Sequence, residues 1–158
     1  MMRTRARFAA ALMGAALLAL AATAVRADEA PVAVDTEGLQ PLGPDWRDSN
    51  PYSGQPKAIE IGSSAFNQNC ARCHGLEAIS GGIAPDLRRL DNECAAEKDK
   101  AKQADCKKDT DGYFINTVRH GRSRNGAVYM PPFEGKLSQE AFWAIKSYLE
   151  TRREKPLQ

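Results

Sequence analysis

The stretch Cys70-Ala71-Arg72-Cys73-His74 is the most informative part of this chain of 158 residues. Cys-x-x-Cys-His is the pattern at which haem c is attached to exported proteins. Residues three and four apart share one face of a helix, so two such thiols can form thioethers with the two vinyl groups of one haem. The histidine that follows then sits over the iron. We therefore predict one covalently attached haem c, bound by Cys70 and Cys73 and ligated by His74.

Other interpretations of this motif are weaker. A thioredoxin-like redox pair needs a βαβ context, which the sequence does not show. A zinc site built from Cys70, Cys73 and His74 would need three ligands within five residues around one small ion. A chance occurrence is the third alternative.

The second axial ligand is predicted from Tyr129-Met130-Pro131-Pro132-Phe133. Met130 is the only methionine after Met13, and the two prolines hold the chain extended, which suits a ligand reaching the iron from the far side. His/Met coordination raises the reduction potential. The alternatives are that Met130 fills the core and that His120 is the ligand, although His120 precedes a helix-ending glycine where an exposed histidine is common.

The N-terminus has the pattern of a secretory signal peptide over residues 1–27. An uncharged stretch over residues 8–25 follows three arginines and leads to Val25-Arg26-Ala27, a cleavage pattern of small residues. An uncleaved membrane anchor is the alternative interpretation. Both deliver the rest of the chain across the membrane, and we predict a periplasmic protein.

Cleavage after residue 27 would reverse the sign of the net charge. The whole chain carries 22 basic and 20 acidic residues, a net charge of +2. The leader holds four of the arginines and no acid, which leaves 18 basic against 20 acidic residues and a net charge of −2. This charge predicts no nucleic-acid binding. We also expect no stable membrane insertion after cleavage, and a monomer.

Hydrophobic periodicity predicts an all-α domain. A proline-rich extended arm is expected over residues 28–57, the domain over 58–153 and a short tail over 154–158. No strand pattern of any length is visible. The expected helices are one from about Ala58 into the cysteine motif, one over residues 112–120 and one from the cap Ser138 to about residue 153.

Two further cysteines, Cys94 and Cys106, enclose a charged insertion. In an oxidising compartment they are expected to form a disulfide. The alternative of a redox-active dithiol suffers from the long spacing between them.

These motifs together resemble the class I c-type cytochromes. The order is specific and covers residues 62 to about 149: helix, CxxCH, proline-containing loop, helix ending in glycine, methionine loop, amphipathic helix. The resemblance implies the class I cytochrome c fold wrapped around one haem. It also implies that Gly62 and Phe66 face Ile145 and Tyr148, and that the Pro85 carbonyl accepts the ring N–H of the proximal histidine.

Within this family, the stretches NCARCHGLEAISGGIAPDLRRLD and FINTVRHGRSRNGAVYMPPFEG resemble the periplasmic Ped-type cytochromes that accept electrons from PQQ-dependent alcohol dehydrogenases. This resemblance implies a one-electron carrier, not an enzyme, which is reduced by such a quinoprotein and passes electrons to a downstream cytochrome or terminal oxidase. The alternatives are a general periplasmic cytochrome serving another dehydrogenase and a haem sensor with an open or labile sixth position.

Three arginines form the last candidate site. No acid lies between Asp111 and Glu134, while Arg119, Arg122 and Arg124 fall within this segment. They are expected to line the haem rim, where they would pair with propionates or steer an acidic partner. The alternative is that they are ordinary exposed arginines.

Overall fold

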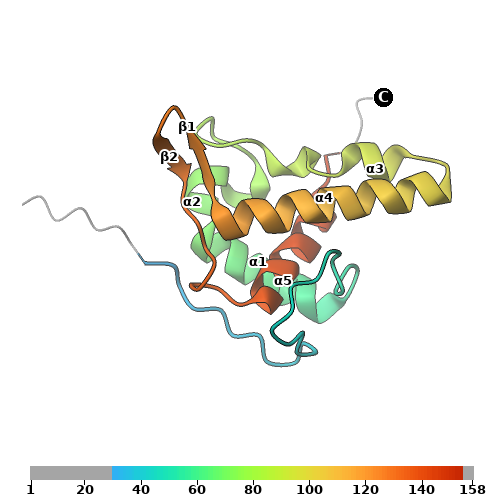
Figure 1. The fold of residues 1–158 in the computed structure, drawn as a ribbon, viewed down its shortest axis with the longest axis horizontal. Helices are drawn as coiled ribbons and strands as arrows, with labels where there is room; N and C mark the ends of the chain where they lie inside the picture. The colour runs from blue at the N-terminus through green and yellow to red at the C-terminus, as the bar shows by residue number, and fades with distance from the viewer. Residues whose placement is uncertain (1–29, 155–158) are drawn as a thin grey trace, which may run out of the picture.

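The structure, a computed structural model, describes residues 30–154. The predicted leader over residues 1–27 lies outside the described residues, as does the tail beyond Glu154. The helices are α1 (Pro56–Asn69), α2 (Ala71–His74), α3 (Asn92–Ala96), α4 (Lys100–His120) and α5 (Gln139–Thr151), with 3₁₀ turns at η1 (Leu76–Ala78) and η2 (Leu87–Arg89), and a hairpin of β1 (Arg122–Arg124) and β2 (Ala127–Met130) (Figure 1).

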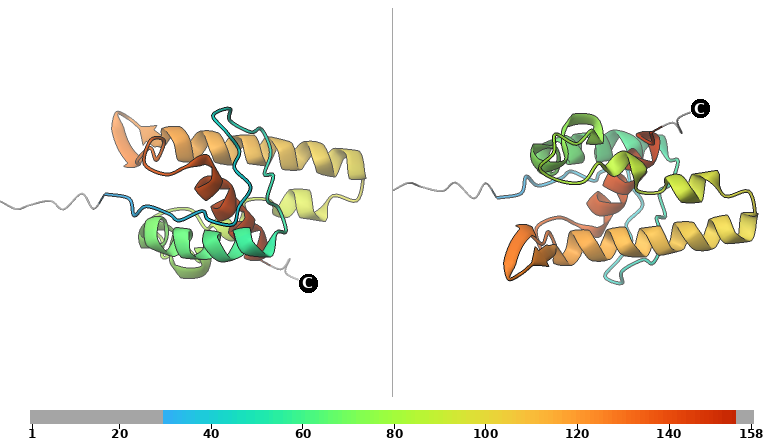
Figure 2. Two further views of the ribbon diagram at one scale, coloured as in Figure 1. Left: turned by 90° about the horizontal axis from the view of Figure 1, so that it is seen from below. Right: turned by 90° about the horizontal axis from the view of Figure 1, so that it is seen from above.

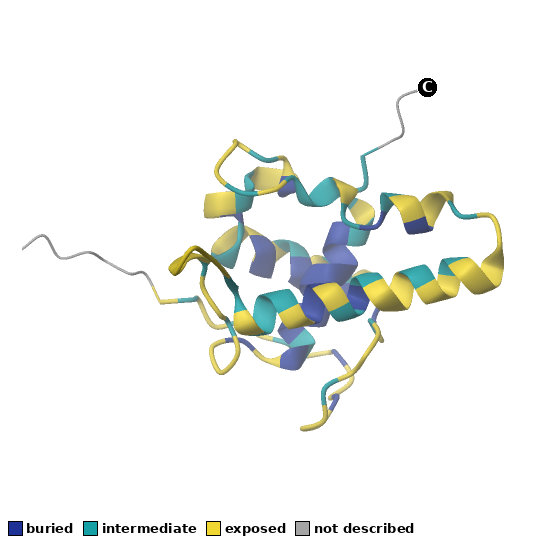
Figure 3. Ribbon diagram, turned by 45° about the horizontal axis from the view of Figure 1, so that its top comes forward, coloured by how far each residue is buried: buried dark blue, intermediate teal, exposed yellow. Residues whose placement is uncertain are grey.

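Helix α5 is the centre of the fold. It begins at the predicted cap, where the Ser138 hydroxyl accepts a hydrogen bond from the Ala141 N–H at 3.2 Å. The apolar face expected of this amphipathic helix is buried, but so is the rest of the surface from Ala141 to Leu149 (Figure 3). The reason is that α5 runs between two layers, with α1 on one side and α4 on the other (Figure 2).

The contact between α1 and α5 is the most extensive one in the described chain. Phe66 packs on Tyr148 with ring centroids 5.5 Å apart. A Cβ atom on Gly62 would collide with the backbone carbonyl of Ala144 and lie 3.0 Å from the Ile145 nitrogen. Gly62 therefore allows α1 and α5 to cross closely. The residues that face one another across this crossing are those that the family resemblance implied.

Helix α4 begins much earlier than the predicted helix over residues 112–120. Asp99 caps it by accepting hydrogen bonds from the backbone of Ala101 and Lys102 at 2.9 and 3.1 Å. The first half is rich in Lys and Ala, which favour helix without needing an apolar face. The pattern of apolar residues therefore could not reveal this part of the helix, because it is exposed to solvent. Only the second half packs inward, where Phe114 lies 6.2 Å from Trp143 between ring centroids.

The short β-hairpin is a correction to the prediction that no strand would form. Strands β1 and β2 pair antiparallel, with a bulge next to Arg122. At the turn, Asn125 and Gly126 have φ values of 51° and 77°. Two-residue hairpin turns require positive φ at both positions, and Asn-Gly is the sequence signal for them. The hairpin is small, and the fold remains mostly helical, as the resemblance implied.

The proline-rich segment before α1 is packed on the body. Leu39 and Leu42 join the hydrophobic core, and Tyr52 is 1% exposed with its hydroxyl donating to the Gln40 carbonyl. Trp46 stacks on Phe142 of α5 at 5.9 Å between ring centroids. These contacts tie the segment to the start of α5.

A buried ion network joins α4, α5 and the residue before α3. Lys146 is 3% exposed, and its Nζ lies 2.9 Å from Glu150, 3.1 Å from Asp111 and 3.7 Å from Asp91. Burial alone would lower the pKa of Lys146, but the three carboxylates outweigh it and raise the pKa above its ordinary value. Because Asp111 also accepts from the Asn50 backbone at 2.8 Å, the N-terminal segment joins this network.

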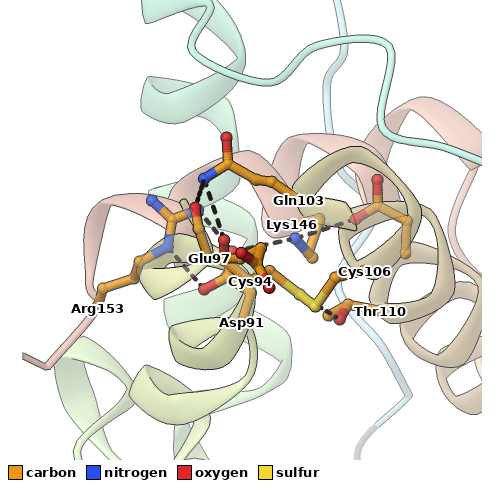
Figure 4. Close-up of a disulfide and its surroundings, with 9 residues drawn as sticks. Asp91, Cys94, Glu97, Gln103, Cys106, Thr110, Lys146 and Arg153 are labelled. Carbon is orange, nitrogen blue, oxygen red and sulfur yellow. Dashed lines mark hydrogen bonds and ion pairs between the residues drawn. A yellow bond between two sulfur atoms is a disulfide. The ribbon is translucent and has the colours of Figure 1, made fainter. Parts of the chain in front are cut away.

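The charged excursion over α3 and the start of α4 is stapled by a disulfide between Cys94 and Cys106, whose Cα atoms are 5.4 Å apart (Figure 4). The Gln103 side chain donates to the Cys94 and Glu97 carbonyls at 3.1 Å each. Together these contacts hold α3 along α4. Within residues 30–154, no helix is both long and apolar enough to cross a membrane.

Replacing Gly62 by alanine should destabilise the protein severely. A methyl group there meets the backbone of α5, which cannot move without repacking the core, so the free energy of unfolding should fall by about 3 kcal/mol or more. Chemical denaturation of the haem-loaded protein measures this change. Gly112→Ala in α4 is the matched control, because nothing lies within 4 Å of its added methyl. That variant should be neutral or gain up to about 1 kcal/mol, and equal losses in both variants would contradict the crossing argument.

Removing the disulfide should cost stability but leave the haem spectrum intact. The double variant Cys94→Ser/Cys106→Ser should unfold with a free energy lower by about 3 kcal/mol, the value expected for a loop of this length. Its visible spectrum should match that of the parent, since the pair lies against α4 and the Lys146 network. The parent treated with a reductant serves as the control. A changed axial-ligand spectrum would contradict a purely structural role.

Candidate functional site

The cysteine motif lies where α1 ends. Cys70 separates α1 from the single turn of α2, and its carbonyl accepts hydrogen bonds from the backbone of Cys73 at 3.1 Å and His74 at 3.0 Å. Both cysteines are free, and Cys73 is exposed. The backbone therefore holds the two thiols one helical turn apart, as attachment to one haem requires.

The thiol chemistry argues against a redox-active pair. Burial and, to a lesser extent, the neighbouring Cys73 together raise the pKa of the Cys70 thiol to about 12. Catalytic dithiols need a thiol whose pKa is lowered, because the thiolate is the nucleophile. No group of three or more potential metal ligands occurs among residues 30–154, so the zinc alternative finds no support there either.

His74 is oriented by a backbone carbonyl. Its Nδ1 lies 3.0 Å from the Pro85 oxygen. A carbonyl only accepts, so this contact places the proton on Nδ1 and leaves Nε2 with a free lone pair for a metal. A hydrogen bond of this kind also raises the basicity of the ligand. The structure thus brings together His74 and Pro85, which the resemblance had paired.

The loop between His74 and Pro85 is tightly folded. Gly75 has a φ of 79°, and a Cβ there would collide with the Ile79 carbonyl. Glu77 and Ala78 also have positive φ values, 57° and 63°, although neither is glycine. Ala78 is fully buried, which anchors the turn. This backbone path returns the chain so that Pro85 reaches the imidazole.

Met130 is the last residue of β2, so it lies at a strand end and not in a free loop. The Gly121 backbone, at φ 69°, packs so closely on the Met130 carbonyl that a Cβ would not fit. Phe133 donates to the Val118 carbonyl at 2.9 Å just beyond. The end of α4 therefore fixes the position of the methionine segment. Figures 1 and 2 place this hairpin and α2 at the same end of the molecule, and Figure 2 shows them on either side of α5.

Exposed apolar side chains gather on these same two segments. Of the seven large hydrophobic residues that are exposed in the described chain, five lie after the cysteine motif or on β2: Leu76, Ile79, Ile83, Val128 and Tyr129. Single exposed apolar residues are ordinary, but a concentration of them marks a binding surface. A covalently bound haem fits this set of groups: two free thiols, an oriented imidazole, a methionine, and apolar side chains on both segments.

The three arginines have different surroundings. Arg119 lies over the Trp46 ring at 4.1 Å and pairs with Glu134 at 2.8 Å, an interaction that lowers the pKa of Glu134. Arg122 lies over the Tyr113 ring at 4.9 Å, and Arg124 is exposed on β1. Neither has a carboxylate partner in the described part of the chain. Arg119 is thus largely occupied, whereas Arg124 is exposed and Arg122 is half-buried against Tyr113.

His120 lies outside this constellation. It is exposed, with Nδ1 at 2.8 Å from the Asn116 side chain and Nε2 at 3.5 Å from Glu134. These surface contacts provide an ordinary explanation for the second histidine.

Comparisons with known proteins agree with this geometry. Residues 57–149 match the family described as cytochrome c oxidase, cbb3-type, subunit III. The chain belongs to the class I c-type cytochromes, which are electron carriers with covalently bound haem c.

Three individual relatives show which kinds of cytochrome domain the chain is similar to. The chain is 54% identical to cytochrome c550 of Pseudomonas aeruginosa over 128 residues, which cover 78% of this chain and 79% of the relative. It is 40% identical to quinohemoprotein alcohol dehydrogenase ADH-IIG of Pseudomonas putida over 69% of this chain and 12% of that protein. It is 30% identical to the cbb3-type cytochrome c oxidase subunit FixP of Rhizobium meliloti, over 66% of this chain and 33% of the relative. No solved structure gave a significant match.

If Met130 is the second axial ligand, Met130→Ala should abolish the low-spin His/Met spectrum while the haem stays attached through its thioethers. Visible spectroscopy of the ferric protein, together with the mass of the purified chain, checks both parts. His120→Ala is the control and should keep the parent spectrum. If the spectrum survived in the Met130 variant and vanished in the His120 variant, His120 would be the ligand.

Proposed function

We propose that this protein is a periplasmic one-electron carrier that accepts electrons from a PQQ-dependent alcohol dehydrogenase and passes them toward a respiratory oxidase. Its haem would be attached through Cys70 and Cys73, with His74 and Met130 as axial ligands. When bound, such a haem supplies a single ferric/ferrous couple and no bond chemistry.

The observation that carries the donor assignment is the recurrence of this domain in alcohol dehydrogenases. The chain matches about one eighth of the length of two quinohemoprotein alcohol dehydrogenases of Pseudomonas putida, at 28% and 40% identity. A cytochrome domain on the same polypeptide as a quinoprotein dehydrogenase is placed to take its electrons. A separate chain with a similar domain can serve the same purpose by diffusion. The match to an oxidase subunit supports the downstream half of the proposal.

The residues around the site have distinct tasks in this proposal. The Pro85 carbonyl orients the His74 ring, so the imidazole needs little rearrangement between oxidation states. The Met130 thioether is neutral and favours ferrous iron, which raises the reduction potential. The end of α4 holds the backbone of that segment through Gly121. A rigid site of this kind suits rapid electron transfer.

Partner docking would use the exposed hairpin beside the haem. Arg122 and Arg124 carry positive charge there, and no acid occurs from residue 112 to residue 133. Val128 and Tyr129 add exposed apolar surface, 64% and 62% exposed. An apolar patch edged by one sign of charge suits brief docking to an acidic partner surface. Arg119 contributes less, because Glu134 neutralises it.

The periplasmic location rests on the leader pattern of residues 1–27 and on the disulfide. A disulfide between Cys94 and Cys106 is typical of an oxidising compartment.

Stopped-flow reduction by a purified PQQ-dependent alcohol dehydrogenase, with its alcohol present, tests the donor. The ferric protein should be reduced at a rate that falls several-fold as ionic strength rises from about 0.01 to 0.15 M, because screening shortens the reach of the hairpin charges. Arg122→Gln/Arg124→Gln should lower the low-salt rate about three- to tenfold and flatten the salt dependence. Lys107→Gln, on an exposed and distant part of α4, is the control for loss of charge.

The outcomes separate the alternatives. Reduction by several unrelated dehydrogenases at equal rates would indicate a general periplasmic cytochrome. A rate insensitive to salt would remove the steering role of the hairpin arginines. A purified protein without the mass of one haem would discard the electron-carrier proposal.

A further inference from the structure

The three residues after α5 form ion pairs with one short segment of the chain. Arg152 pairs with Glu77 at 2.6 Å, Arg153 with Asp91 at 2.6 Å, and Glu154 with Arg89 at 2.6 Å. All three partners belong to residues 77–91. We call Arg152, Arg153 and Glu154 the C-terminal clamp.

Backbone contacts strengthen this attachment. The Glu154 N–H donates to the Arg88 carbonyl at 3.1 Å, and the Glu154 carbonyl accepts from the Asn92 side chain at 3.4 Å. Asp91 is only 5% exposed, and its carboxylate accepts two hydrogen bonds from Arg153, at 2.6 and 2.7 Å. A lone surface ion pair contributes little to stability. Here several ion pairs, the double hydrogen bond between Arg153 and Asp91, and backbone hydrogen bonds all act on one segment. Together they hold that segment more firmly than one exposed ion pair would.

The clamped segment carries the carbonyl that orients His74. Asp86 follows Pro85, and its carboxylate accepts from the Arg88 side chain at 2.7 Å and from the Arg88 backbone at 3.0 Å. This pairing lowers the pKa of Asp86 to about 2. Arg88 also lies 3.6 Å from Glu154. A continuous path of contacts thus runs from Glu154 through Arg88 and Asp86 to Pro85.

The loop needs such support. Residues 75–86 contain a single 3₁₀ turn as regular structure, and two non-glycine residues in it have positive φ. Of its apolar side chains, Leu76, Ile79 and Ile83 are exposed and only Ala78 is fully buried. The buried Ala78 and the Arg152–Glu77 pair therefore hold the start of the loop, and the pairs of Glu154 with Arg88 and Arg89 lie at the end that carries Pro85.

We propose that the C-terminal clamp fixes the Pro85 carbonyl against His74 and thereby sets the reduction potential of the protein. Glu154 and Arg88 are positioning residues for the proximal ligand, although they belong to neither the haem motif nor the ligand set. The proposal rests on the proposed function in one respect, that His74 ligates the iron. A firmly held carbonyl makes the imidazole more basic, which stabilises ferric iron. Loosening the clamp should therefore raise the potential.

Glu154→Gln in the full, haem-loaded protein is the test. It removes the charge that meets Arg88 and Arg89 while it preserves the size of the side chain. At a fixed solution potential the ferrous-to-ferric ratio should rise two- to fivefold, which is about 20 to 40 mV at 59 mV per tenfold change. The His74 ring N–H proton, followed by NMR in the ferrous protein, should exchange faster with solvent. Glu60→Gln is the matched control, because Glu60 forms an exposed pair with Lys57 on α1, and it should change neither quantity.

Arg88→Gln should repeat the effect, and the double variant Arg88→Gln/Glu154→Gln should shift the potential no further than either single one, because both act through one path. A Glu154→Gln protein with the parent potential and the parent proton exchange overturns the proposal. A loss of unfolding free energy without a shift in potential overturns it too, because the clamp would then support only the fold. In both cases an intact His/Met spectrum leaves the electron-carrier function standing, whereas a parent protein without attached haem would refute that function instead.

Discussion

The close crossing of α1 and α5 at Gly62 is the contact on which the rest of the structure depends. A side chain there would strike the backbone of Ala144, so the two helices touch with no side chain between them. This contact sets the position of the end of α1, where Cys70 and the turn carrying His74 begin. It also fixes α5, against which α4 and η2 pack. The haem-binding motif is therefore positioned by a glycine eight residues before its first cysteine.

The start and the middle of α5 are each tied to segments far away in sequence. At its start, Glu140 accepts from the Leu42 backbone and Gln139 from the Arg47 backbone, at 2.8 and 2.7 Å, so the proline-rich segment is part of the body. Along its middle, Lys146 gathers three carboxylates from α4, α5 and the residue before α3. Removal of one partner from such a network would leave a buried charge unpaired. The free-energy cost of that unpaired charge is larger than the stability that the intact network contributes. The network thus specifies which elements meet.

The two sides of the site are supported in different ways. The methionine side rests on neutral packing, with Gly121 against the Met130 carbonyl and Phe133 bonded to the end of α4. The histidine side rests on a loop with strained residues, which charged groups near the C-terminus hold in place. In the proposed electron carrier, His74 and Met130 must both stay in place as the charge of the iron changes. The charged support is the more sensitive of the two to substitution and to salt.

The sequence by itself determined the chemistry of this protein and much of its fold class. Three local patterns can be recognised without coordinates: the spacing from Cys70 to His74, the single methionine after the leader at Met130, and the amphipathic last helix. The first half of α4 was missed because a helix surrounded by solvent shows no periodic pattern of apolar residues. The hairpin was missed because a four-residue strand is too short to show an alternating pattern, although Asn125-Gly126 is a signal for its turn. Only the tertiary structure decided that Arg119 is occupied by Trp46 and Glu134, that Lys146 is buried, and that the last described residues reach the loop of Pro85. Except for the Lys146–Glu150 pair, which spans one helical turn, these contacts join charged side chains to partners that are distant in the sequence. Their partners depend on how the helices cross, and no spacing along the sequence encodes that.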